Sequence, residues 1–250
     1  MFFIRRYKFH FSAIISSILL STATEVSAEY SPVIKENTFG FEIGATRVIY
    51  NHDSPAASFW IKNGHQYPII AQANILNSDK NSKAPFIITP PVLRVDGEMQ
   101  TRLRVIPVSQ TLNKDTEELF WICIKGVPPK EELGESTTEF KKASQFNINI
   151  ITNSCIKLIS RPSKINMTVK DAVQKIDVKV QEERLVIYNK SPMYINISSA
   201  KINSKKVEIP NGYIKPYSNE SIRFKVKKGD EMQLSILNDY GAEIIHKITL

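Results

Sequence analysis

The 250-residue chain lacks the residue patterns on which common enzyme chemistries depend. Four histidines and two cysteines form no His-Glu-x-x-His motif and no cysteine cluster, so nothing predicts a metal site. Nine glycines are spread singly, which excludes a glycine-rich loop for phosphates. Acidic pairs such as Glu131-Glu132 and Glu182-Glu183 are typical of solvated turns, because no partner residue accompanies them. We therefore predict that the protein is not an enzyme and uses no metal or cofactor.

Long apolar runs are also missing, apart from a short one near the N-terminus. Basic residues at Arg5, Arg6 and Lys8 precede an apolar run over 11–20, and small residues occupy Val26-Ser27-Ala28. This order is typical of a cleaved secretory signal peptide, and the run is shorter than the roughly 20 residues that span a bilayer. We predict a signal peptide over 1–28, an exported mature chain and no membrane insertion.

The net charge of +8 falls to +6 without the first 28 residues, which hold three basic residues and one acid. Lysine pairs such as Lys205-Lys206 and Lys227-Lys228 have no interleaved aromatic residues, so they are typical of solvated strand ends. No nucleic-acid partner is predicted.

Export affects the interpretation of the two cysteines. Cys123 and Cys155 both lie in the mature chain, and an oxidising compartment favours their pairing over metal binding or thiol catalysis. We predict one disulfide; the alternative is two buried free thiols.

Short β-branched or aromatic segments, bounded by polar residues, proline or glycine, fill the mature chain and predict an all-β fold. No stretch has a sustained helical period. The two strand series, separated near Pro162, predict two β-sandwich domains. The predicted strands are Phe39–Ile43, Arg47–Tyr50, Ala57–Lys62, Ile69–Leu76, Phe86–Thr89, Arg102–Ile106, Leu119–Lys125 and Phe146–Ile151, then Ile176–Val180, Arg184–Tyr188, Tyr194–Ile197, Lys206–Ile209, Ser221–Val226, Met232–Leu237 and Ile244–Ile248.

The strand that contains Phe146, Ile148 and Ile150 has the most informative pattern. Its apolar residues alternate with asparagines, so one face is apolar and the other polar. At a sheet edge, such a strand would offer both backbone groups and large side chains to a partner's strand. The pattern alone favours the simpler interpretation, in which these residues fill their own domain's core.

Several motifs together resemble the periplasmic chaperones of the chaperone-usher pathway, over essentially all of the mature chain. The resemblance is closest to the branch with a long loop, here about 127–145, between cysteines that form a disulfide at its base. The motifs are Thr89-Pro90-Pro91 followed by Val92-Leu93-Arg94, Glu117 to Trp121 leading into Lys125-Gly126-Val127-Pro128-Pro129, Ile156 to Pro162, and Asn238-Asp239-Tyr240-Gly241.

The resemblance implies two immunoglobulin-like β-sandwiches in a bent (boomerang) arrangement, and it assigns roles to residues. Arg47 and Lys157 match cations that hold the C-terminal carboxylate of a fibre subunit. Phe146, Ile148 and Ile150 match the side chains of a donor strand, and Thr152 is the next, less apolar, position on that face. Residues 30–37 match an extended first strand beside the donor strand. Glu117, Arg161 and Asp239 match a buried charge network between the domains.

The function implied is that of a periplasmic chaperone. It would bind, fold and cap fimbrial or surface-fibre subunits one-to-one by donor-strand complementation, and would deliver them to an outer-membrane usher. The implied domains are 29–161 and 162–250. The exposed donor strand further suggests self-association of the free protein. The alternatives are a secreted two-domain immunoglobulin-like binding protein and a structural fibre protein.

Overall fold

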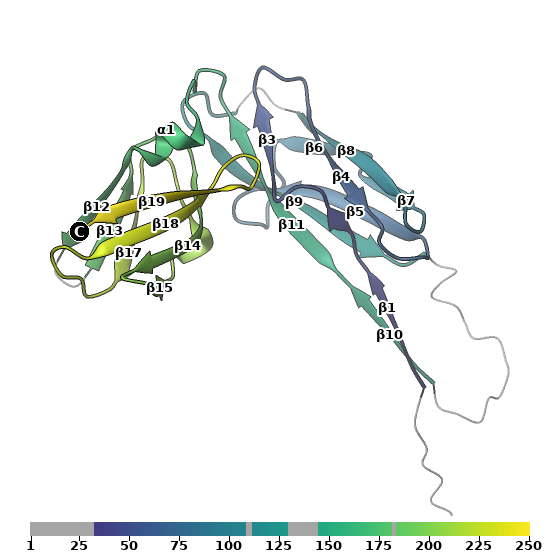
Figure 1. Cartoon of the computed structure of the whole chain (residues 1–250). Coiled ribbons are helices and arrows are strands. Elements are labelled where there is room, and N and C mark those ends of the chain that lie inside the picture. The colour runs from purple at the N-terminus through teal and green to yellow at the C-terminus, as the bar shows by residue number, and fades with distance from the viewer. Residues whose placement is uncertain (1–32, 109–111, 130–144, 182–183) are drawn as a thin grey trace, which may run out of the picture.

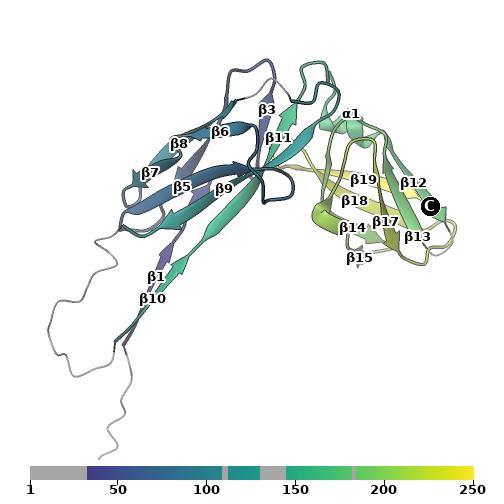
Figure 2. The same cartoon turned by 180° about the vertical axis from the view of Figure 1, so that it is seen from behind.

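The computed structural model describes residues 33–108, 112–129, 145–181 and 184–250 of the chain. The predicted signal peptide and all but the ends of the predicted long loop lie outside these residues. The described chain forms two β-sandwich lobes that meet at an angle (Figure 1), seen from behind in Figure 2. The predicted all-β class, with two sandwiches in a bent arrangement, is confirmed.

The N-terminal lobe packs two sheets face to face. One has the strand order β3-β11-β9-β5-β7 and the other the order β2-β4-β8-β6. Its strands are β2 (Glu42–Ile43), β3 (Arg47–Asn51), β4 (Ala57–Lys62), β5 (Ile69–Leu76), β6 (Phe86–Thr89), β7 (Val92–Val95), β8 (Gln100–Pro107), β9 (Glu118–Val127) and β11 (Asn153–Arg161).

Alternation along these strands builds the core of this lobe. In β4 and β8, Phe59, Ile61, Leu103 and Val105 point inward, while their neighbours in sequence stay exposed or half-buried. They meet a facing layer from β5, β9 and β11, in which Leu158 is fully buried. Burying both sheets' apolar faces against each other provides the main stabilising free energy of the lobe.

The C-terminal lobe has its own core, built in the same way. One sheet has the order β12-β13-β17, and the other has the order β15-β14-β18-β19, with β16 paired to β14. Its strands are β12 (Ile176–Gln181), β13 (Arg184–Asn189), β14 (Ile195–Ile202), β15 (Lys205–Val207), β16 (Tyr213–Ile214), β17 (Asn219–Arg223), β18 (Glu231–Leu237) and β19 (Glu243–Thr249), and the 3-10 turn η2 (Pro210–Gly212) precedes β16.

One short helix interrupts the β structure, a difference from the sequence prediction. Helix α1 (Val169–Val173) is too short to produce a helical period, but its start is encoded locally. Thr168 accepts a hydrogen bond from the backbone of Asp171, and the Asp171 carboxylate accepts one from the backbone of Thr168. This reciprocal capping satisfies backbone groups at the helix start.

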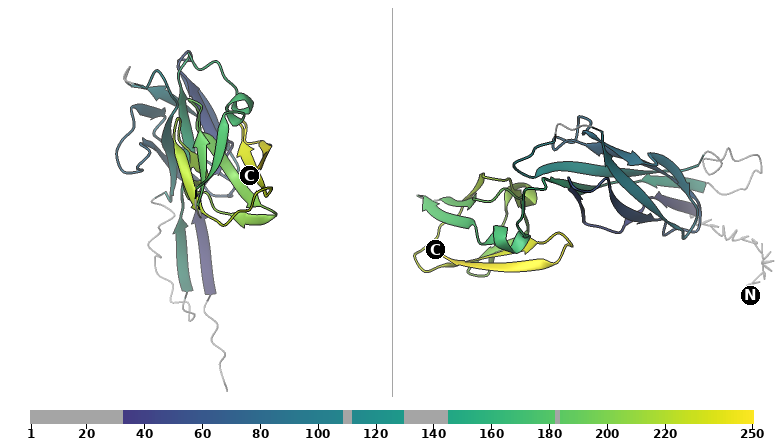
Figure 3. Two further views of the ribbon diagram at one scale, coloured as in Figure 1. Left: turned by 90° about the vertical axis from the view of Figure 1, so that its left-hand side faces the viewer. Right: turned by 90° about the horizontal axis from the view of Figure 1, so that it is seen from above.

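Strands β1 (Val33–Phe39) and β10 (Gln145–Ile151) form a separate parallel ribbon. The ribbon extends beyond the N-terminal lobe, at the end away from the joint between the lobes (Figures 1 and 3). The predicted strand Phe39–Ile43 is divided here, because the chain crosses from this ribbon to the sheet of β2. At the crossing, a Cβ on Gly126 would lie 2.4 Å from the carbonyl oxygen of Phe39, so only glycine lets the two backbones approach this closely.

Candidate functional site: an exposed strand and a cation pair

Strand β10 exposes a row of large apolar side chains. Phe146, Ile148 and Ile150 are 57%, 46% and 40% exposed, so they do not fill the core of their own domain. Within the residues that the structure describes, β10 pairs only with β1, which leaves its other edge without a strand partner. The interpretation favoured by pattern alone, that this strand packs inside its own domain, is therefore wrong.

The continuation of the same chain segment lies in a different environment. Strand β11 follows β10 after Thr152 and pairs with both β3 and β9. Thr152 belongs to the junction and not to the exposed face, because its backbone N–H and its hydroxyl both donate to the carbonyl oxygen of Phe39.

Arg47 and Lys157 are brought side by side by this pairing. They are direct register partners in the parallel pair of β3 and β11, so their side chains leave the sheet on the same face. Arg47 is buried, at 7% exposed, and its Nε–H has no hydrogen-bond partner. A buried guanidinium with an unsatisfied donor carries a free-energy penalty, which an incoming acceptor would relieve.

The C-terminal lobe supplies the other contacts of the two cations. Lys157 Nζ donates to Asn196 Oδ1 at 2.8 Å and lies 4.8 Å from the ring centre of Tyr213. Arg47 Nη1 contacts the carbonyl oxygen of Leu237 at 3.5 Å. The pair is therefore located where the two lobes meet.

The electrostatics of the pair favour an anionic ligand. Burial, together with the positive charges of Arg47 and Lys80, lowers the pKa of Lys157 to about 8. Burial also lowers the pKa of Arg47, an effect that the Asp239 carboxylate opposes. Two partly desolvated cations that repel each other would both be stabilised by one carboxylate placed between them.

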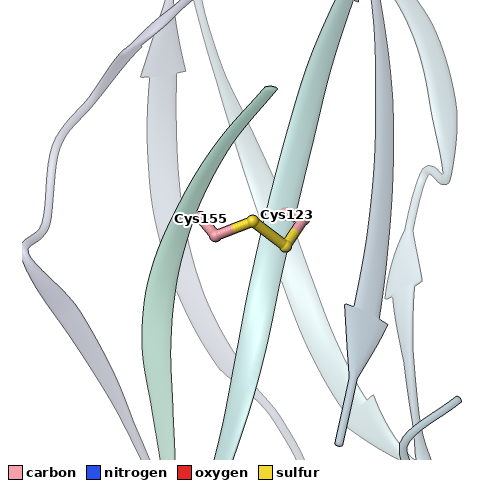
Figure 4. The surroundings of a disulfide bond; sticks show 2 residues. All are labelled: Cys123 and Cys155. Atoms are coloured by element: carbon pink, nitrogen blue, oxygen red, sulfur yellow. A yellow bond between two sulfur atoms is a disulfide. The ribbon is translucent and has the colours of Figure 1, made fainter. Parts of the chain in front are cut away.

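The disulfide determines what lies opposite Lys157. Cys123 in β9 and Cys155 in β11 are direct antiparallel partners joined by a 2.02 Å bond (Figure 4), which confirms the predicted pairing. Lys157, two residues after Cys155, lies opposite Trp121, two residues before Cys123, on the same face. Arg47, Lys157 and Trp121 thus form a cross-strand row. Sequence reasoning missed Trp121 as part of the site, although a direct cross-strand disulfide would have fixed this register.

A charge network joins the two lobes. Arg161, at the end of β11, donates from Nε to Glu117 at 2.6 Å and from both terminal nitrogens to Asp239 at 2.7 Å. Glu117 is almost fully buried and accepts a further bond from the backbone N–H of Tyr194, in the C-terminal lobe. These hydrogen-bonded ion pairs raise the pKa of Arg161, although burial opposes the rise. The three residues predicted to form this network do lie together.

Two other features, a metal-binding cluster and a membrane-spanning helix, are absent from the described part of the chain. No group of three or more histidine, cysteine or acidic side chains there could hold a metal ion. No helix among the same residues is long and apolar enough to cross a membrane.

Two family models match the chain, one for each lobe. Residues 40–166 match the pili and flagellar-assembly chaperone PapD N-terminal domain, and residues 171–248 match the pili assembly chaperone PapD C-terminal domain. Together the two matches cover most of the described residues.

Curated relatives and solved structures agree with these matches. The chaperone protein SefB of Salmonella enteritidis is 43% identical over 214 residues, covering 86% of each chain. The E. coli chaperone DraB has a similar crystal structure, with a TM-score of 0.75 and 31% identity over 87% of this chain and 100% of that chain. The structure of the Salmonella enterica SafA pilin in complex with the SafB chaperone matches with a TM-score of 0.76 and 28% identity, over 87% of this chain and 100% of that chain.

Proposed function

This chain belongs to the family of PapD-type pili assembly chaperones, and from that premise we propose that it captures fibre subunits through Arg47, Lys157 and strand β10. This is a family of non-enzymatic periplasmic chaperones of the chaperone-usher pathway, and we propose that this protein also acts in the periplasm. Its partners are fimbrial or surface-fibre subunits, bound one-to-one. The alternatives of a secreted binding protein and a fibre protein have no support in the comparisons.

The exposed apolar row of β10 is the observation that carries the proposal. A subunit whose immunoglobulin-like sandwich lacks its last strand has an open groove in its core, and a strand with an unpaired edge can fill it. Backbone hydrogen bonds would form along that edge. Phe146, Ile148 and Ile150 would enter the groove, each contributing roughly 0.7–1.5 kcal/mol of gross burial, because only about half of each side chain is still exposed.

The cation pair provides the second contact with the subunit. We propose that the C-terminal carboxylate of the subunit binds between Arg47 and Lys157, which are register partners. The unsatisfied Nε–H of Arg47 is a donor available for such an acceptor. Because β11 continues directly from β10, a carboxylate fixed at this point would set the register in which the subunit pairs with the donor strand.

The network of Glu117, Arg161 and Asp239 is proposed to have a structural role. It connects β11 to residues of the C-terminal lobe, and that lobe also supplies Asn196 beside Lys157. A fixed angle between the lobes therefore keeps the carboxylate site assembled.

Capture of this kind needs no covalent step and no nucleotide. The free energy of binding would drive complementation, and the bound subunit would be delivered to an outer-membrane usher, where another subunit's extension replaces β10.

We propose that residues 1–28 direct export and are cleaved, and that the two domains are 29–161 and 162–250. The described structure supports this boundary, since β11 ends at Arg161.

The free chaperone is further proposed to self-associate through its exposed β10. Two copies could pair their open edges and cover the apolar row. A concentration-dependent dimer in light scattering would support this, and a monomer at the highest accessible concentration would contradict it.

The proposed function is tested by periplasmic co-expression of the tagged chain with the small exported proteins encoded beside it. Wild type is compared with Lys157→Ala and with the control Lys125→Ala, which removes an exposed lysine from the same face of the sheet. We expect a one-to-one complex with wild type and with Lys125→Ala, and its loss with Lys157→Ala. Equal recovery with all three would contradict the carboxylate anchor.

A further inference from the structure

A lysine outside the cation pair is held beside the same row. Lys80 lies in the turn between β5 and β6, and its Nζ is 3.9 Å from the ring centre of Trp121. Trp121 is the direct cross-strand neighbour of Lys157. The row of Arg47, Lys157 and Trp121 is therefore extended on its far side by a third cation.

The turn that carries Lys80 is well defined. Asp79 accepts hydrogen bonds from the backbone N–H groups of Asn81 and Ser82, and the backbone N–H of Lys80 donates to the carbonyl oxygen of Asn77. Lys80 itself has a φ of 59°, in the left-handed region. A non-glycine residue in this conformation is held by its surroundings, and here the turn directs the side chain onto the indole ring.

The row has donors and positive charge but few acceptors. The indole Nε1–H of Trp121 is buried without a hydrogen-bond partner, as is the Nε–H of Arg47. No carboxylate of the described residues forms an ion pair with Lys80 or Lys157. The positive charge of Lys80 also acts on Lys157, where it helps to lower the pKa.

We propose that Lys80, held on Trp121, is a third cation of the subunit-binding site and contacts a carboxylate in the last residues of the subunit. This inference rests on the proposed function and extends it. The carboxylate can belong to the chain terminus, shared with Arg47 and Lys157, or to an acidic side chain close to the terminus. In either case, the cation–π contact keeps the Lys80 ammonium in position without neutralising it.

The test uses defined peptides in place of the subunit. The probe is an N-acetylated ten-residue peptide of alternating threonine and valine, prepared as the free acid, as the amide, and as the amide with aspartate at the penultimate position. Binding is measured by calorimetry to the mature chain carrying Lys80→Ala, Lys80→Arg or Lys157→Ala. The control is Lys83→Ala, which removes an exposed lysine from the same connection. The left-handed φ of position 80 costs alanine about as much as it costs lysine, so the substitution is expected to leave the turn unaltered.

We expect Lys80→Ala to weaken binding about three- to fivefold, as for one exposed ion pair, and Lys80→Arg to restore it. A loss seen with the free acid and not with the plain amide identifies the chain terminus as the ligand. A loss seen only with the aspartate peptide identifies the side chain. Because Lys80 is exposed, its contribution should also disappear at about 0.5 M salt.

Two results would overturn the inference in distinguishable ways. If Lys157→Ala abolishes binding while Lys80→Ala binds every peptide as Lys83→Ala does, Lys80 is not part of the site and the proposed function is unaffected. If Lys157→Ala binds the free acid as tightly as wild type does, the carboxylate anchor is wrong, and the role of Lys80 is wrong with it.

Discussion

Strands β10 and β11 are consecutive in the chain, yet they have opposite environments. β10 pairs only with β1 in the described residues and exposes Phe146, Ile148 and Ile150. β11 pairs on both edges, and its Leu158 is fully buried. The junction between them is one residue, Thr152, which is hydrogen-bonded to the crossing chain at Phe39.

This difference shows that alternation of apolar residues does not by itself identify a core strand. β10 alternates and is exposed, whereas β11, in which Leu158, Ile159 and Ser160 are buried in succession, is covered by a facing sheet and paired on both edges. In this chaperone, the exposed strand β10 is proposed to complete the fold of a subunit. The covered strand β11 fixes β10 to the N-terminal lobe.

The largest effect on the free protein is expected from a core substitution in β11. Leu158→Ala should lower the free energy of unfolding by about 2–5 kcal/mol, because it leaves a cavity between the sheets. Ile150→Ala in β10 should change it by less than about 0.5 kcal/mol, because the side chain is exposed in the free protein. Urea unfolding of both variants measures this.

The same pair should behave differently when a subunit is present. Ile150→Ala should reduce recovery of the complex although the folding stability of the variant chaperone is unchanged. The reason is that one side chain that enters the subunit groove is lost. Normal recovery with Ile150→Ala would mean that the apolar row of β10 is not the donor face.

Removing the disulfide is expected to have the next largest effect. Replacing both Cys123 and Cys155 by serine opens a covalent link between residues 32 apart, which should lower the free energy of unfolding by about 2–4 kcal/mol. Chemical unfolding with and without reductant checks this value. The double-serine variant should not respond to reductant, whereas wild type should become equally unstable in it.

Subunit binding should weaken as pH rises, through β11 and not through β10. The depressed pKa of Lys157, about 8, means that the free protein loses this positive charge at mildly alkaline pH. A bound carboxylate favours the charged form, so affinity for a free-acid peptide should fall about tenfold between pH 7 and 9.5. Lys157→Arg should remove most of this dependence, because arginine stays protonated. Calorimetry at several pH values measures both proteins.

The same shift has the opposite sign for the stability of the free protein. Unfolding restores Lys157 to its ordinary pKa of 10.5, so the unfolded chain binds more protons between about pH 8 and 10.5. The contribution of this residue to stability therefore rises with pH over that window, while the affinity for a carboxylate falls.

The smallest effect is expected at the junction. Thr152→Val removes the hydroxyl that donates to Phe39, which should cost about 1 kcal/mol of folding stability. Recovery of the subunit complex should be nearly unchanged, because Thr152 is engaged with the crossing chain. A complex strengthened by the added methyl group would instead make position 152 a fourth residue of the donor face.

Much of this arrangement could be predicted from the sequence, because local patterns encode it. The strands from Ala57–Lys62 to Phe86–Thr89 have the predicted bounds. The Cys123–Cys155 bond is predicted because an exported chain enters an oxidising compartment, and it is present. Arg47 and Lys157 lie together, as do the three residues of the charge network, although their roles in binding remain proposals.

The rest depends on long-range register, which no local pattern contains. Strands β7 and β11 are absent from the predicted strands because they are defined by the sheets they join, and α1 is too short to show a period. Lys80 and Trp121 meet only because the turn after β5 is folded back onto β9. Asn196 and Tyr213 reach Lys157 only through the packing of one lobe against the other.

The most direct test of the central claim is amide hydrogen exchange of β10 in the free chaperone and in its subunit complex. Our account predicts rapid exchange in the free protein of those β10 amides that face away from β1, since that edge is unpaired, and strong protection of the same amides in the complex, with little change in β11. A stable complex in which the amides of β10 exchange as rapidly as in the free protein would contradict donor-strand complementation.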